Sequence, residues 1–177
     1  MSYYYDSDAA DKAVLFIEKF CTHVKGEKSG QPFLMEEWQK DDIVKPLFGW
    51  KHKDTKLRKY RSCYIELPRK NGKSSLAAAL ILLLLFEGEP GAECISAASD
   101  RFQANIVFHI AKEMISNNKH LRSRCKVLRN TIEYKNCWYK SISAEAYTKH
   151  GLNCHGIIFD ELHAQSSREL FDVLATS

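Results

Sequence analysis

One short segment constrains the fold of this chain more than any other: residues 67–74, which read Leu-Pro-Arg-Lys-Asn-Gly-Lys-Ser. We expect residues 62–67 to form a strand, and the Ala- and Leu-rich stretch Lys73–Glu87 favours a long helix. A strand, a glycine-containing loop and a helix in this order are the setting that a phosphate-binding loop requires. The sequence therefore predicts a site for phosphate groups at the start of this helix.

The loop carries the residue types that this chemistry needs. Gly72 permits the sharp turn without a Cβ that would crowd an anion. Lys73 supplies a positive charge for the β- and γ-phosphates of a nucleotide, and Ser74 supplies a hydroxyl for Mg²⁺. The predicted nucleotide-binding residues of this region are Pro68, Arg69, Lys70, Asn71, Gly72, Lys73, Ser74 and Ser75.

The loop also departs from the general phosphate-loop pattern. Leu67 stands where the first glycine of G-x-x-x-x-G-K-[ST] is usual, so the tripeptide Gly-Lys-Ser alone is equally compatible with a surface turn. The flanking elements and a second motif decide between these interpretations.

The second motif is the apolar run 156–159, which ends in Asp160 and Glu161. At the carboxyl end of a strand, Asp160 is suited to hold Mg²⁺ and Glu161 to act as general base toward a water molecule. Taken alone, the same pattern describes a strand followed by an acidic helix start. Its position after the phosphate loop favours the catalytic interpretation.

The remaining pattern alternates helices and strands. We expect helices over residues 8–24 and within 32–50, a strand at 93–97, and two or three short strands between residues 125 and 143. Capping-box patterns at Asp100 and Ser166 predict two further helix starts. This alternation indicates an α/β fold with a largely parallel sheet flanked by helices. Residues 1–50 are expected to form a helical N-terminal segment and residues 51–177 a P-loop core.

Composition excludes several other classes. None of the six cysteines forms a C-x-x-C pair, so we expect free thiols rather than a disulfide framework or a zinc site. The apolar run 76–86 is too short to span a bilayer. The histidines and cysteine at 150, 154, 155 and 163 lack metal-ligand spacing. The basic stretch 51–61 is compatible with a solvated loop or with contact to a DNA backbone.

The motifs together resemble the large terminase subunit of tailed bacteriophages. Residues 68–74 are similar to the variant phosphate loop of that family, which also dispenses with the first glycine, and residues 159–165 (Phe-Asp-Glu-Leu-His-Ala-Gln) are similar to its Walker B segment. Residues 37–39 with 47–50 resemble its adenine-recognition segment, and residues 88–104 resemble the strand and helix that follow the loop. The resemblance extends from about residue 34 to the last residue.

The resemblance implies a RecA-like ATPase that uses ATP and Mg²⁺ to drive double-stranded DNA into a capsid. The partners implied are DNA, the portal protein, the small terminase subunit and further copies of the chain, in the host cytoplasm and without a membrane. It also implies that Gln39 reads adenine, and the alternative is a solvated glutamine on a helix. Arg69 is then an arginine finger, catalytic beside Glu161 and Lys73, or else an electrostatic phosphate contact or a solvated arginine.

The family also has parts that we do not find in these residues. Its fold continues with a coupling strand, placed between the strands of the two motifs, and with a nuclease domain. We therefore expect a sheet that is incomplete at the C-terminus and backbone groups there that lack a partner. A non-catalytic nucleotide-binding fragment or prophage remnant, and another P-loop motor such as a helicase, are the alternatives.

Overall fold

The computed structural model describes residues 2–68, 71–99, 101–143, 154–162 and 168–175. Its central feature is a five-stranded sheet with the order β4-β5-β6-β3-β7. Strand β3 (Glu93–Ala98) pairs in parallel with both β6 (Cys137–Ser143) and β7 (Cys154–Phe159). Its residues are almost all buried, as expected for a parallel strand covered on both faces.

Two short antiparallel strands extend the sheet beyond β6. They are β5 (Thr131–Tyr134) and β4 (Cys125–Val127), joined to each other and to β6 by tight turns. The expected two or three strands between residues 125 and 143 are therefore confirmed. The expected parallel sheet is confirmed for the three strands β6, β3 and β7.

Helices cover both faces of the sheet. On one face lie α3 (Lys73–Glu87), α4 (Arg101–Asn117) and the short α5 (Lys119–Arg122), whose apolar residues join the main hydrophobic core. On the other face, Leu170 and Leu174 of α6 (Glu169–Ala175) pack against Ile95 and Ala97 of β3. Alternate residues of β3 thus supply two separate cores.

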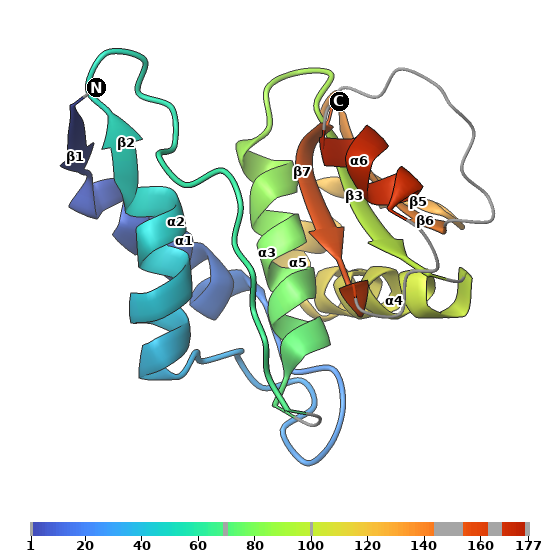
Figure 1. The fold of residues 1–177 in the computed structure, drawn as a ribbon. Helices are drawn as coiled ribbons and strands as arrows, with labels where there is room; N and C mark the ends of the chain where they lie inside the picture. Colours follow the sequence, from blue (N-terminus) through green and yellow to red (C-terminus); the bar gives the residue numbers. More distant parts are fainter. Residues whose placement is uncertain (1, 69–70, 100, 144–153, 163–167, 176–177) are drawn as a thin grey trace.

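The N-terminal part packs on the far side of α3 from the sheet (Figure 1). It contains α1 (Ser7–Phe20), the π-helix η1 (Gln39–Val44) and α2 (Lys45–Gly49). Strands β1 (Tyr3–Tyr5) and β2 (Trp50–His52) form a small antiparallel pair beside them. One continuous apolar cluster runs from Ala13 of α1 through α3 to the sheet, so α3 is the element that both parts share.

The structure corrects the expected strand at residues 62–67. Helix α3 follows as predicted, but residues 62–67 form no strand, although Ile65 packs against the core. A strand exists only through hydrogen bonds to a neighbour. Within the described residues, β7 is the edge strand of the sheet, and no ladder joins it to residues 62–67.

Other boundaries also differ from the predictions. Helix α1 ends at Phe20 rather than at residue 24, because Cys21 leaves the helical conformation and its carbonyl accepts the N–H of Phe33. The expected helix within residues 32–50 is confirmed, and helical residues run from 37 to 49. The caps predicted at Asp100 and Ser166 lie outside the described residues.

Among the residues that the structure describes, no helix is long and apolar enough to cross a membrane. No group of three or more His, Cys, Asp or Glu side chains in the same residues is arranged to hold a metal ion.

A glycine sets how closely β7 approaches α3. A Cβ on Gly156 would lie 2.7 Å from Cδ1 and 3.1 Å from Cβ of Leu84 in α3. Gly156→Ala should therefore lower the free energy of unfolding by about 1–3 kcal/mol through overpacking. Leu84→Ala in the same chain should recover part of this loss, because the two residues share one contact. Urea unfolding of both single variants and the double variant measures the coupling, and strictly additive losses would contradict the close approach.

Candidate nucleotide-binding site

The N-terminus of α3 has features that suit an anion. Gly72, the residue before the helix, adopts a left-handed conformation with φ of 74°, and among the residues that the structure describes no side chain caps the first turn. A Cβ on Gly72 would meet no atom of the described residues within 4 Å. The first N–H groups of any α-helix lack intrahelical acceptors and carry the positive end of the helix dipole. This arrangement favours a bound phosphate.

The carboxyl end of β7 lies against this helix start. The backbone N–H of Asp160 donates to the carbonyl of Ala97 at 3.0 Å, which holds the residues after β7 in register with β3. Lys73 Nζ lies 3.4 Å from Glu161 Oε1, and Ser74 Oγ donates to Asp160 Oδ2 at 3.5 Å. The fold thus brings four predicted site residues together. Lys73 and Glu161 are 88 positions apart in the sequence, and Ser74 and Asp160 are 86 positions apart.

Burial and charge shape the chemistry of Asp160. Burial raises the pKa of its carboxyl group, and the neighbouring charge of Glu161 raises it further. The ammonium of Lys73 and the hydrogen bond from Ser74 act in the opposite direction. A cation at this position would relieve the same desolvation and repulsion. The Asp160 carboxylate and the Ser74 hydroxyl are hard oxygen donors, so the residues present fit Mg²⁺.

Glu161 has an unusual backbone conformation. Its φ of 53° lies in the left-handed region, which non-glycine residues rarely adopt. Such strain costs about 1–3 kcal/mol and is concentrated at functional sites. The conformation accompanies a side chain that reaches back to Lys73. The sequence gives no sign of this strain.

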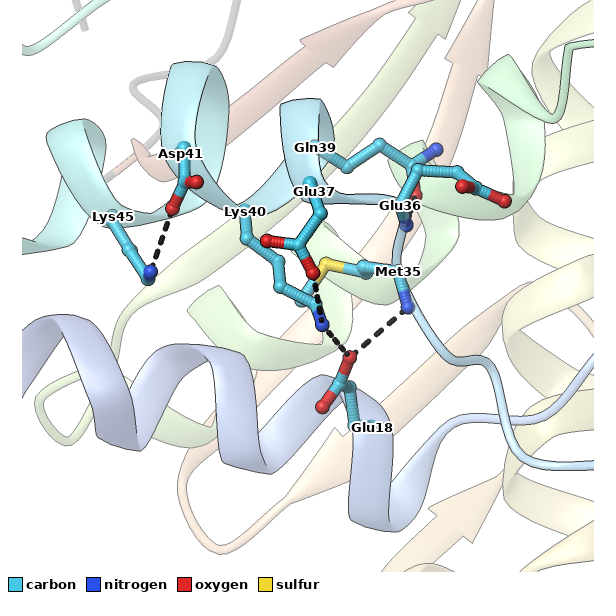
Figure 2. A network of polar contacts seen from close by, with 8 residues as sticks. All are labelled: Glu18, Met35, Glu36, Glu37, Gln39, Lys40, Asp41 and Lys45. Carbon is cyan, nitrogen blue, oxygen red and sulfur yellow. Dashed lines mark hydrogen bonds and ion pairs between the residues drawn. The ribbon is translucent and has the colours of Figure 1, made fainter.

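Gln39 lies at the first position of the π-helix η1, and irregular helical turns of this kind are frequent at functional sites. Only 6% of its surface is exposed, and its Oε1 accepts the backbone N–H of Glu36 at 3.0 Å. Figure 2 shows this side chain beside the Glu36 backbone and Lys40 beside the Glu18 carboxylate of α1. Sequence reasoning missed Glu18, because no local pattern predicts a contact across 22 positions.

The structure describes some but not all of the other residues predicted to bind the phosphates. Asn71 Nδ2 donates to the carbonyl of Pro68 at 3.3 Å and closes the loop before α3. Ser75 is half-buried in the first turn of α3. Arg69 and Lys70 lie outside the described residues.

Several cations of the basic stretch 51–61 make contacts within the fold. Lys51 pairs with Asp6 at 3.0 Å, and Lys59 lies within 5 Å of the ring centres of Tyr3, Trp50 and Tyr60. Arg58 lies over the ring of Phe48. These three cations therefore hold β1, β2 and the following loop together.

Comparison with known proteins gives one consistent family. A family model described as "Terminase large subunit, ATPase domain" matches residues 37–177. The large terminase subunit of Enterobacteria phage HK97 is 32% identical over 160 residues, which are 85% of this chain and 30% of that protein. The crystal structure of the HK97 large terminase superimposes with a TM-score of 0.79 at 27% identity, over 94% of this chain and 34% of the other. The chain thus spans about a third of the length of these relatives.

Two glycines offer a matched test of the anion site. Gly72 precedes α3 and Gly91 lies in the turn between α3 and β3, both have positive φ, and an added Cβ at either position meets no atom of the described structure within 4 Å. Each Gly→Ala change should therefore cost a similar backbone strain of about 1–2 kcal/mol. Only Gly72→Ala should also weaken the binding of Mg²⁺ with inorganic triphosphate, measured by calorimetry. Equal binding by the two variants would contradict the placement of the anion.

Proposed function

Because the chain belongs to the family of terminase large-subunit ATPase domains, we propose that it hydrolyses ATP to drive the packaging of double-stranded DNA into a phage capsid. One observation carries the proposal. Lys73 and Ser74 at the start of α3 meet Glu161 and Asp160 at the end of β7. The residues that we propose for phosphate binding, magnesium binding and general-base catalysis are therefore in contact.

Each of these four residues has a distinct task in hydrolysis. The backbone N–H groups at the start of α3 and the ammonium of Lys73 bind the β- and γ-phosphates, for which Lys73 exchanges its contact with Glu161. Ser74 and Asp160 hold Mg²⁺, which offsets the negative charge of the phosphates when it is bound. Glu161 accepts a proton from the attacking water as its oxygen bonds to the γ-phosphorus and the bond to ADP breaks.

Base recognition is assigned to Gln39, whose amide can accept from N6 of adenine and donate to N7. Pro68, Lys70, Asn71 and Ser75 complete the loop around the phosphates as further binding residues.

Arg69 is proposed as an arginine finger within the same chain. Its guanidinium would neutralise charge that develops on the γ-phosphate during transfer. Arg69→Ala would then reduce turnover far more than nucleotide affinity. Equal losses of both would instead assign Arg69 to ordinary phosphate binding.

The partners follow from the family and are proposals for this chain. We propose that the motor contains several copies of the chain and acts on DNA at the portal protein of the procapsid, in the host cytoplasm. The small terminase subunit is the expected partner in DNA selection. No membrane is involved in this scheme.

A second candidate function is nucleotide binding without rapid turnover. One observation favours it: β7, which leads into Asp160 and Glu161, is the edge strand among the described residues, and residues 62–67 before the loop form no ladder. Among the described residues, the backbone before Asp160 and Glu161 is paired with a strand on one side only, and residues 62–67 before the loop are paired with none. Binding tolerates small shifts of such groups better than catalysis does.

The midpoint of thermal unfolding, measured with and without Mg-ATP, shows whether the folded chain binds the nucleotide. A ligand that binds only the folded state stabilises it by about 2.7 kcal/mol at a hundredfold excess over Kd, so the midpoint should rise. Lys73→Ala should abolish the rise. Lys45→Ala is the matched control, because Lys45 is a helical lysine of similar exposure with one ion pair, to Asp41. The same rise in all three proteins, or in none, would contradict the proposed site. If the wild type and Lys45→Ala show the rise and Lys73→Ala does not, measuring phosphate release distinguishes ATP hydrolysis from nucleotide binding without rapid turnover.

A further inference from the structure

One carboxylate oxygen of Glu18 in α1 contacts residues before and after Gln39. Glu18 Oε1 accepts the backbone N–H of Met35 at 3.1 Å and lies 3.0 Å from Nζ of Lys40 (Figure 2). Met35 precedes Gln39 by four positions, and Lys40 is the next residue after it. Helix α1 therefore fixes the turn that enters η1 at two points.

The Gln39 amide depends on this turn for its orientation. A backbone N–H can donate to the amide oxygen but not to the amide nitrogen, so the bond from Glu36 to Oε1 selects one of the two flips of the amide. Glu36 follows Met35 directly, so the bond from Met35 to Glu18 positions the peptide that selects the flip. Two hydrogen bonds in series thus connect the Glu18 carboxylate to the orientation of Gln39.

The flip matters because adenine and guanine differ at the same edge. An amide oxygen has two lone pairs, of which Glu36 uses one. The second can accept from the amino group at C6 of adenine, whereas guanine presents an oxygen acceptor there. A fixed amide oxygen therefore favours ATP over GTP, and an amide free to flip would lose this preference.

The environment of Glu18 supports a positioning role. The side chains of Glu18 and Lys40 are 23% and 21% exposed, so solvent only partly screens their contact. Lys40 also approaches Glu37 at 3.8 Å, but that carboxylate is 86% exposed. The neighbouring pair Lys45–Asp41 lies within one helical stretch and does not reach α1. Among the ion pairs at residues 37–45, the Glu18 pair alone joins the turn to another element in the described structure.

We propose that Glu18 is a positioning residue for purine selectivity, which sets the ATP preference of the site through Met35, Lys40 and the Gln39 amide. The inference rests on the proposed nucleotide-binding function. Glu18 itself lies outside residues 37–177, the range that the family model matches.

The experiment compares the affinities of the full chain for Mg-ATP, Mg-GTP and Mg²⁺ with inorganic triphosphate. Glu18→Ala should lower the ratio of ATP to GTP affinity up to about tenfold, which is the value of one well-made hydrogen bond. Its triphosphate affinity should equal that of the wild type, because the phosphate loop is unchanged. Asp41→Asn, which breaks the neighbouring pair to Lys45, is the control and should keep the wild-type ratio.

A purely structural role for Glu18 would give a different pattern. It would lower all three affinities alike and leave the ratio unchanged, and this result overturns the proposal. If Glu18→Ala does not fold, Glu18→Leu decides, because it keeps most of the side-chain volume while it removes both the acceptor for Met35 and the charge beside Lys40. A reduced ratio in Glu18→Leu then supports the proposal, and a wild-type ratio overturns it.

If the proposed nucleotide-binding function itself is wrong, the three affinities show a different pattern. A wild type that binds neither ATP nor triphosphate overturns the nucleotide site and the inference together. A wild type that binds triphosphate but shows no preference between ATP and GTP overturns base recognition by Gln39, and the inference with it. A wild type that prefers ATP, with Glu18 variants that keep this preference, overturns the inference alone.

Discussion

The proposed chemistry depends on the meeting of a helix start with a strand end. Lys73 and Ser74 contact Glu161 and Asp160 only because β7 runs parallel to β3 and delivers its carboxyl end to the first turn of α3. The glycine at position 156 allows this approach, since a larger residue would meet Leu84 of α3. The charged groups are partly buried there, which strengthens their mutual effects and explains the raised pKa of Asp160.

The N-terminal part of the molecule packs against helix α3. The apolar residues of α3 are buried almost all round, because α1 packs on one side of the helix and the sheet on the other. The position of η1 relative to the phosphate loop is therefore set through α1 and α3. The Glu18 carboxylate adds a polar tie at the point where the chain enters η1, so packing and hydrogen bonding act together on the segment that contains Gln39.

Sequence reasoning predicted the parts that local pattern determines. Helix Lys73–Glu87 and the strand before Asp160 follow from composition and periodicity, and the order of the two motifs favoured a shared catalytic role for their residues. The strand at 62–67 was wrong because pairing is a property of neighbours rather than of the segment. The Glu18 contacts, the π-helical turn at Gln39 and the left-handed Glu161 could not be predicted, since each arises from tertiary packing.

The central claim is that Glu161 acts on water while Lys73 holds phosphate, and one measurement tests it directly. Single-turnover hydrolysis of Mg-ATP by Glu161→Gln should fall by about 10²–10⁴-fold, the usual contribution of a general base. Its affinity for Mg-ATP should not fall, because Lys73 no longer shares its charge with a carboxylate. Hydrolysis at the wild-type rate, or a parallel loss of hydrolysis and binding, would contradict the account.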